Sequence, residues 1–253
     1  MKKVRFLSGL LACAMCLPFS CVSPKAAEAN STAVKNTELV LVVDKSGSMH
    51  RLRKDTIGSF NSVIDEQKKS DKNGEVYVTT VMFNDSSDKI HDRKDIKNVE
   101  NITEKEYNPN GCTALLDAVG NTITELSANK EVSKNNVVFV VITDGYENAS
   151  REFKRDQIKK LIDEKKKAGW NFIFLGANID SFAEGGNLGI DKKYARDFVA
   201  SAAGVKEAFR RVTIATNQIR EGRKIDLDEN LNNENNKDNN KENNKENSKE
   251  NNK

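Results

Sequence analysis

Hydrophobic residues in the middle of the chain gather in short runs. Three of these runs hold only apolar residues and one glycine: LVLVV at 39–43, VVFVVI at 137–142 and FIFLG at 172–176. Runs without alternation are typical of strands buried on both faces, as in a parallel sheet covered by helices. The stretch at 75–83, EVYVTTVMF, alternates more and fits a strand nearer the sheet edge. Short strands at 88–91 and near Phe198 would complete six.

Between these runs, apolar residues recur at helical spacing. The expected helices are marked by Ile57, Phe60 and Ile64, by Leu115, Val119, Ile123 and Leu126, by Ile158, Leu161 and Ile162, and by the stretch 204–220. Gly169 can end the third helix as a C-terminal cap. The alternation of strands and helices predicts a doubly wound, Rossmann-like α/β domain with a six-stranded, mostly parallel sheet flanked by helices.

The N-terminus has the three-part pattern of an export signal. Basic residues precede the apolar stretch FLSGLLACAMCLPFSCV, and small residues follow at Ala27 and Ala29. This order predicts a secretory signal peptide at 1–29, followed by a linker at 30–36. The protein is therefore expected to be secreted or held in the cell envelope.

Lipid attachment at Cys21 is the alternative route to the envelope. The preceding residues, LPFS, fit a bacterial lipobox poorly because bulky Phe19 stands where a small residue is usual. Removal of the signal leaves Cys112 as the only cysteine, and a single thiol cannot form an internal disulfide. The fold must therefore rest on its apolar core.

The C-terminal end is almost entirely Asn, Lys and Glu. From residue 226 to 253 it has very little to bury, which predicts a disordered low-complexity tail after a domain at 37–225. The whole chain has 41 basic and 38 acidic residues, a net charge of +3, which argues against dedicated nucleic-acid binding. The body of the protein has no apolar segment long enough to predict a transmembrane span.

Oxygen-bearing side chains stand where the apolar runs end. The first run continues into DKSGSM, which places Asp44, Ser46 and Ser48 at alternate positions. The second ends in ITDG with Asp144, and the loop YNPNGCTALLDAVG carries Thr113 to the start of a helix. In doubly wound sheets, ligands bind at the carboxyl ends of the strands. Five such oxygens predict a site for a hard cation, Mg²⁺ first, with Mn²⁺ or Ca²⁺ as alternatives.

The motifs DKSGS, GCT and TDG, in this order, resemble the metal-ion-dependent adhesion site (MIDAS) of von Willebrand factor A domains. The likeness covers about 185 residues, the size of one domain. The phrases TALLDAVGNTI, VITDGYENASREF and WNFIFLGANID resemble the small stand-alone bacterial members. One motif alone would favour a capped turn, but three in order are specific. The resemblance implies that Ser46, Ser48 and Thr113 contact the metal, while Asp44 and Asp144 hold its waters and orient the hydroxyls.

A protein-binding role follows from this ligand set. Neutral hydroxyl ligands leave much of the cation's charge uncompensated, so an Asp or Glu of a protein partner can fill its open position. The surrounding loops, with His50, Asn110 and Tyr146, would supply specificity. The expected function is an exported, metal-dependent adhesion or interaction module and not an enzyme. The sequence leaves its oligomeric state open.

Two other functions remain as alternatives. The first is a Mg²⁺-dependent phosphoryl-transfer enzyme with Asp44 as nucleophile. Against it, Ser46 stands where haloacid-dehalogenase-like phosphatases have a second acid, and no P-loop or GxGxxG motif is present. The two histidines, His50 and His91, lie in different elements and offer no nucleophile-and-base pair. The second alternative is a chelatase-like assembly subunit.

Overall fold

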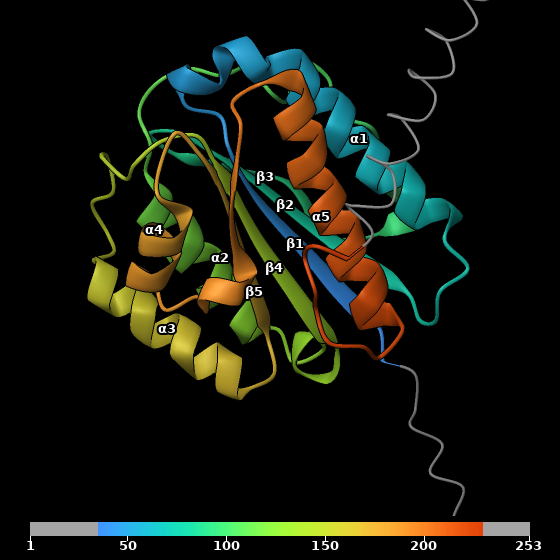
Figure 1. Ribbon diagram of the computed structural model, residues 1–253. Coiled ribbons are helices and arrows are strands. Elements are labelled where there is room, and N and C mark those ends of the chain that lie inside the picture. Colours follow the sequence, from blue (N-terminus) through green and yellow to red (C-terminus); the bar gives the residue numbers. More distant parts are fainter. Residues whose placement is uncertain (1–34, 230–253) are drawn as a thin grey trace, which may run out of the picture. The chain divides into compact units, whose positions relative to one another are not determined.

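Six strands form one sheet in the computed structural model, which describes residues 35–229 (Figure 1). The strands are β1 (Thr37–Asp44), β2 (Val76–Phe83), β3 (Ser87–Asp95), β4 (Asn136–Thr143), β5 (Asn171–Ala177) and β6 (Ala195–Phe198). Their order across the sheet is β3-β2-β1-β4-β5-β6, and only β3 runs antiparallel to its neighbour. The predicted six-stranded, mostly parallel sheet is confirmed. The predicted signal peptide lies outside the described residues.

Helices cover both faces of the sheet. The α-helices are α1 (Arg53–Lys69), α2 (Leu115–Ala128), α3 (Arg155–Lys167), α4 (Ser181–Asn187) and α5 (Ala202–Arg220), and the short 3₁₀ helices are η1 (Gly47–Leu52), η2 (Ile96–Asn98), η3 (Val132–Lys134) and η4 (Lys192–Tyr194). Helices α1 and α5 pack on one face, and α2 and α3 on the other (Figure 1). In the described part of the chain, no helix is both long enough and apolar enough to span a membrane.

The central strands show why their sequences lack alternation. Every residue of β1 is buried. Leu41 and Val43 belong to the core cluster beneath α1 and α5, whereas Val40 and Val42 belong to the cluster beneath α2 and α3. Because successive side chains of a strand point to opposite faces, a strand covered on both faces must be apolar throughout.

Two elements differ from the sequence expectation. Strand β3 runs from 87 to 95, longer than the predicted 88–91, because its residues SDKIHDRKD are mostly charged and carry no apolar signal. Charged side chains on an edge strand hinder pairing with another chain. Helix α4 was not predicted, since its sequence SFAEGGN includes two glycines. Asp180 caps its start: the side chain accepts a hydrogen bond from the Ala183 N–H at 2.9 Å.

The packed chain continues past the domain end predicted at residue 225. Leu227 is fully buried in the core cluster beneath α1 and α5. Asp228 pairs with Arg196 of β6, with Oδ2 and Nη2 2.6 Å apart. The packed chain therefore extends at least to residue 229, because Leu227, an apolar residue inside the polar stretch, finds a place in the core. The rest of the predicted tail, 230–253, lies outside the described residues.

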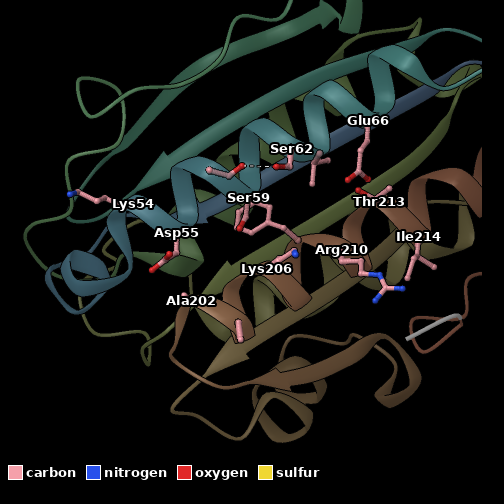
Figure 2. Close-up of a pocket in the computed structure, with 14 residues that line it drawn as sticks. Lys54, Asp55, Ser59, Ser62, Glu66, Ala202, Lys206, Arg210, Thr213 and Ile214 are labelled. Atoms are coloured by element: carbon pink, nitrogen blue, oxygen red, sulfur yellow. Dashed lines mark hydrogen bonds between the residues drawn. The ribbon is translucent and has the colours of Figure 1, made fainter. Parts of the chain in front are cut away.

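A groove of about 780 Å³ runs between α1 and α5 (Figure 2). Small residues on the facing helices leave this space, among them Gly58 and Ser59 of α1 and Ala202 and Ala203 of α5. Lys54, Asp55 and Ala202 lie at the end of the groove formed by the first turns of both helices, next to the carboxyl edge of the sheet. The five predicted metal-site residues do not line it.

Gly120→Ala should destabilise the domain because α2 passes very close to an aromatic ring. A Cβ atom at position 120 would lie 2.6 Å from the ring of Phe153. Overpacking of this kind costs about 1–3 kcal/mol in the free energy of unfolding, which urea denaturation measures. Gly58→Ala is the matched control, since nothing lies within 4 Å of its Cβ position in α1. The control should gain up to about 1 kcal/mol from helix propensity, and equal losses in both variants would contradict the packing explanation.

Candidate metal site

The predicted site lies where the strand order reverses. From β1 the chain builds the sheet outward through β2 to β3, and from β4 outward through β5 to β6, so the crevice opens between β1 and β4. These two strands are parallel neighbours, with Val43 opposite Ile142. Their next residues, Asp44 and Thr143, therefore end side by side at the carboxyl edge. Ligands of doubly wound sheets bind at such a switch point.

Asp44 is a fully buried carboxylate fixed by two hydrogen bonds. Its Oδ1 accepts from the Ser46 N–H at 2.6 Å, and its Oδ2 accepts from the Thr143 hydroxyl at 2.6 Å. Burial raises the pKa of Asp44 to about 6, although the hydrogen bonds from Thr143 and Ser46 oppose the rise. A bound cation would supply the opposite charge that favours the ionised form.

Asp144 faces the two serines across the crevice. The Oγ atoms of Ser46 and Ser48 are 3.1 Å apart, and the Ser48 hydroxyl donates to Asp144 Oδ1. The other oxygen, Asp144 Oδ2, is buried and has no hydrogen-bond partner among the described residues. Burial raises the pKa of Asp144, while the Ser48 hydrogen bond and the charge of Arg51 lower it. An unpartnered buried carboxylate oxygen is a free ligand for a cation.

Thr113 reaches the same place from the loop before α2. The Thr113 N–H donates to Asn148 Oδ1 at 2.8 Å, and in return the Asn148 backbone N–H donates to the Thr113 carbonyl oxygen at 3.0 Å. A Cβ atom built on Gly145 would lie 3.7 Å from Thr113 Oγ1 and 3.8 Å from Ser48 Oγ. The two hydroxyls therefore gather around the turn that follows Asp144, and the structure brings all five predicted metal-site residues together.

Backbone hydrogen bonds join the loops into one frame. The Lys45 carbonyl accepts from the Asn110 N–H at 2.9 Å, and the Gly111 carbonyl accepts from the Gly47 N–H at 3.0 Å. Gly111 has a φ of +75°, and a Cβ there would collide with the Asp85 carboxylate. The hydroxyl of Tyr107 donates to the Asp44 carbonyl at 2.7 Å. The site is thus held in shape by the protein before any ligand binds.

Sequence reasoning missed the residues that hold Thr113 in place. Besides Asn148, these are Glu147 and Asp117. Glu147 accepts from the N–H groups of Leu116 and Ser150, both within 2.9 Å, and Asp117 accepts from three consecutive N–H groups at 151–153. These contacts tie the start of α2 to the loop after β4. The only local signal was the acid and the amide in the phrase YENAS, and the partners of these two side chains are set only by the fold.

The predicted partner-contact residues all lie at this edge. His50, Asn110 and Tyr146 are exposed, and Tyr146 has 52% of its surface accessible. The side chain of Asn110 is already engaged: it accepts from Asn84 Nδ2 at 3.0 Å and donates to the Asn108 carbonyl at 2.8 Å. Asn110 therefore stabilises the loop, whereas His50 and Tyr146 face outward.

The donors fit a hard cation. Among residues 35–229, no three His, Cys, Asp or Glu side chains are grouped so that they could hold a metal ion. The candidate site instead offers two carboxylates and three hydroxyls. Oxygen donors without sulfur or imidazole suit Mg²⁺, Mn²⁺ or Ca²⁺ better than soft metals. Lys45 does not compete for the carboxylates, because its ammonium pairs with Asp88 of β3.

Comparison with known proteins agrees with the fold and the motif order. The sequence model of the von Willebrand factor type A domain family matches residues 38–211. No curated protein matches the chain.

Two solved structures share the fold at low sequence identity. The structure of proximal thread matrix protein 1 from the mussel byssus, with a zinc-occupied MIDAS motif, is 17% identical in sequence and has a TM-score of 0.53. The match covers 71% of this chain and 45% of the mussel chain. This chain thus spans less than half of the mussel protein. The vWF domain of the type V pili tip protein Mfa5 from Porphyromonas gingivalis is 13% identical in sequence and has a TM-score of 0.53. This match covers 76% of this chain and 97% of the Mfa5 domain.

Proposed function

The chain belongs to the von Willebrand factor type A domain family, and from that premise we propose that it is an exported, metal-dependent protein-binding module. In this proposal a divalent cation held by Asp44, Ser46, Ser48, Thr113 and Asp144 bridges to an Asp or Glu of a protein partner. Domains of this family bind protein partners. The metal, the acidic ligand and the export are parts of the proposal.

The unpartnered Oδ2 of Asp144 is the observation that carries the proposal. It is a buried carboxylate oxygen beside a second buried carboxylate, Asp44, and three hydroxyls. Burying two carboxylates without a counter-charge is unfavourable, and a cation between them would relieve this. In this proposal the three hydroxyls contact the cation directly and the two carboxylates hold its waters. The ligands that touch the metal are then neutral, and a carboxylate from outside the chain can take the open position.

The identity of the cation rests on the donors of this chain. The mussel protein holds zinc in its MIDAS motif, which supports a divalent cation at such a motif in general. Five oxygen donors without His or Cys favour Mg²⁺ here, with Mn²⁺ or Ca²⁺ as alternatives.

The enzyme alternative fits the geometry less well. Both carboxylate oxygens of Asp44 accept short hydrogen bonds inside the protein, and the residue is fully buried. A nucleophile must instead present an oxygen to its substrate. His91 is buried on β3, with Nδ1 3.0 Å from the Thr80 hydroxyl, so it offers no base at the site. A chelatase-like assembly subunit remains a second alternative, distinguished by a requirement for an ATPase partner.

Thr113→Ala should abolish most of the metal-dependent partner binding, because it removes a ligand without adding charge. Disturbing a residue that merely orients a metal ligand typically costs 10–100-fold in metal affinity, and losing a ligand should cost at least as much. The measurement is capture of partners from the cell envelope or medium in Mg²⁺ and in EDTA. Cys112→Ser is the control: it changes the exposed neighbour and leaves the donors intact.

Truncation after Glu229 should leave the affinity unchanged. Binding that survives both EDTA and Thr113→Ala would defeat the proposal. Release of phosphate from model esters, lost on chelation, would support the enzyme alternative.

A further inference from the structure

Two large hydrophobic side chains stand exposed at the same edge of the sheet. Within residues 35–229, Tyr146 and Val199 are the large hydrophobic residues that are exposed and not merely half-buried, with 52% and 73% of their surface accessible. Tyr146 follows β4 and Val199 follows β6, and both strands run parallel to β1. Both residues therefore lie at the carboxyl edge that carries the candidate metal site. Single exposed apolar residues are common on protein surfaces, but their confinement to this edge is specific.

The backbone holds Val199 outward. Its carbonyl oxygen accepts from the Ser201 N–H at 2.7 Å and packs directly against the Cα of Gly204, where any Cβ would collide with it. The Ser201 hydroxyl accepts from the Gly204 N–H at 3.2 Å and caps α5. The preceding residue, Phe198, is buried in the core. The loop cannot easily turn to bury Val199, so the valine is presented to solvent by a fixed segment.

Tyr146 is presented in the same way. It lies between Gly145 and Glu147, and the side chain of Glu147 holds the loop through the N–H groups of Leu116, Ala149 and Ser150. Apolar and aromatic side chains on preformed loops lose little conformational entropy when a partner covers them. Buried aromatic anchors of this kind dominate the binding energy of many interfaces.

The spacing of the strands gives the size of the surface. Neighbouring strands lie about 4.8 Å apart, so β6 is roughly 15 Å from β1 and about 10 Å from β4. A contact that reaches from the metal to Val199 is therefore broader than one acidic side chain.

We propose that the partner covers the carboxyl edge from the metal site past Tyr146 to Val199. Its surface presents a carboxylate to the cation and an apolar side chain to Val199, roughly 15 Å away across the strand spacing. This inference rests on the proposed function, because the metal fixes one end of the contact. Val199 then acts as a specificity residue that separates the partner from other acidic proteins.

Site-specific photocrosslinking in the full-length chain tests the extent of this surface. The probe is p-benzoylphenylalanine, placed at Val199, at Tyr146 or at exposed Lys130 on the opposite edge of the sheet. We expect one adduct of the same mass from positions 199 and 146, lost in EDTA and in Asp44→Ala, and no such adduct from position 130. A crosslinked band supports the proposal only if it depends on both the metal and the position of the probe.

The outcomes separate the two proposals. A metal-dependent adduct from 146 but none from 199 overturns the wider surface and leaves the proposed function standing. No metal-dependent adduct from either position overturns both. Once the crosslinked partner is purified, Val199→Asp should weaken its binding at least tenfold while the stabilisation by Mg²⁺ stays as in the wild type. Unchanged binding by Val199→Asp would also overturn the wider surface.

Discussion

Mg²⁺ at about 100 times its dissociation constant should raise the melting temperature of the domain by roughly 5–10 °C, and Asp44→Ala should lose this rise. A ligand that binds only the folded state at this excess stabilises it by about 2.7 kcal/mol. For a domain of this size, each kcal/mol raises the melting temperature by about 2–4 °C. The unfolded chain lacks the site, because its five ligands come from three separate loops. Thermal denaturation with increasing Mg²⁺ measures the effect.

Asp92→Ala is the matched control for this experiment. Asp92 is an exposed carboxylate on β3 whose nearest partner is Lys89. Its removal changes the net charge by the same amount as Asp44→Ala but leaves the donors untouched. The control should respond to Mg²⁺ as the wild type does. A full response in Asp44→Ala would place the cation elsewhere and refute the site.

In the absence of metal, Asp44→Asn should stabilise the domain at pH 7 by roughly 3 kcal/mol. The folded protein raises the pKa of Asp44 from 3.8 to about 6, chiefly through burial. Between these two pH values the folded state binds more protons than the unfolded chain, so this group's contribution to stability falls as the pH rises through the window. The difference between the two pKa values corresponds to roughly 3 kcal/mol once Asp44 is ionised.

The amide can keep both hydrogen bonds of the carboxylate. Its oxygen can accept from the Ser46 N–H, and its NH₂ can donate to the Thr143 hydroxyl, which can then donate to the Gly145 carbonyl at 3.1 Å. Urea denaturation in EDTA from pH 4 to pH 8 tests the prediction. The two proteins should be nearly equal in stability near pH 4 and diverge up to about pH 6. A difference that does not change with pH would show that Asp44 is not the cause, and Mg²⁺ should restore stability to the wild type alone.

The strands, and the candidate metal-site residues that the fold brings together, could be picked out because each leaves a local signal. The run ending at Asp44 is apolar throughout since β1 is covered on both faces. The candidate site residues of the first and third loops follow directly after such runs, and Thr113 stands just before a helix. The charged edge strand β3 and the glycine-containing α4 leave no such signal. Residues such as Asn148 and Glu147 could not be assigned either, because they act on backbone groups about 30 positions away in the sequence. Leu227 could have been noticed, as an apolar residue just inside a polar stretch.

The contact made by Asp228 has a mechanical consequence. It binds Arg196 of β6 through both carboxylate oxygens, and it lies 3.8 Å from Arg211 of α5. A pull on the chain beyond residue 229 is therefore resisted by the Asp228–Arg196 ion pair and by buried Leu227, together with the contacts of Glu229 to Gln218 and Arg223 at the end of α5. A load applied through the C-terminal extension is shared with the edge of the sheet instead of unwinding the last helix turn by turn.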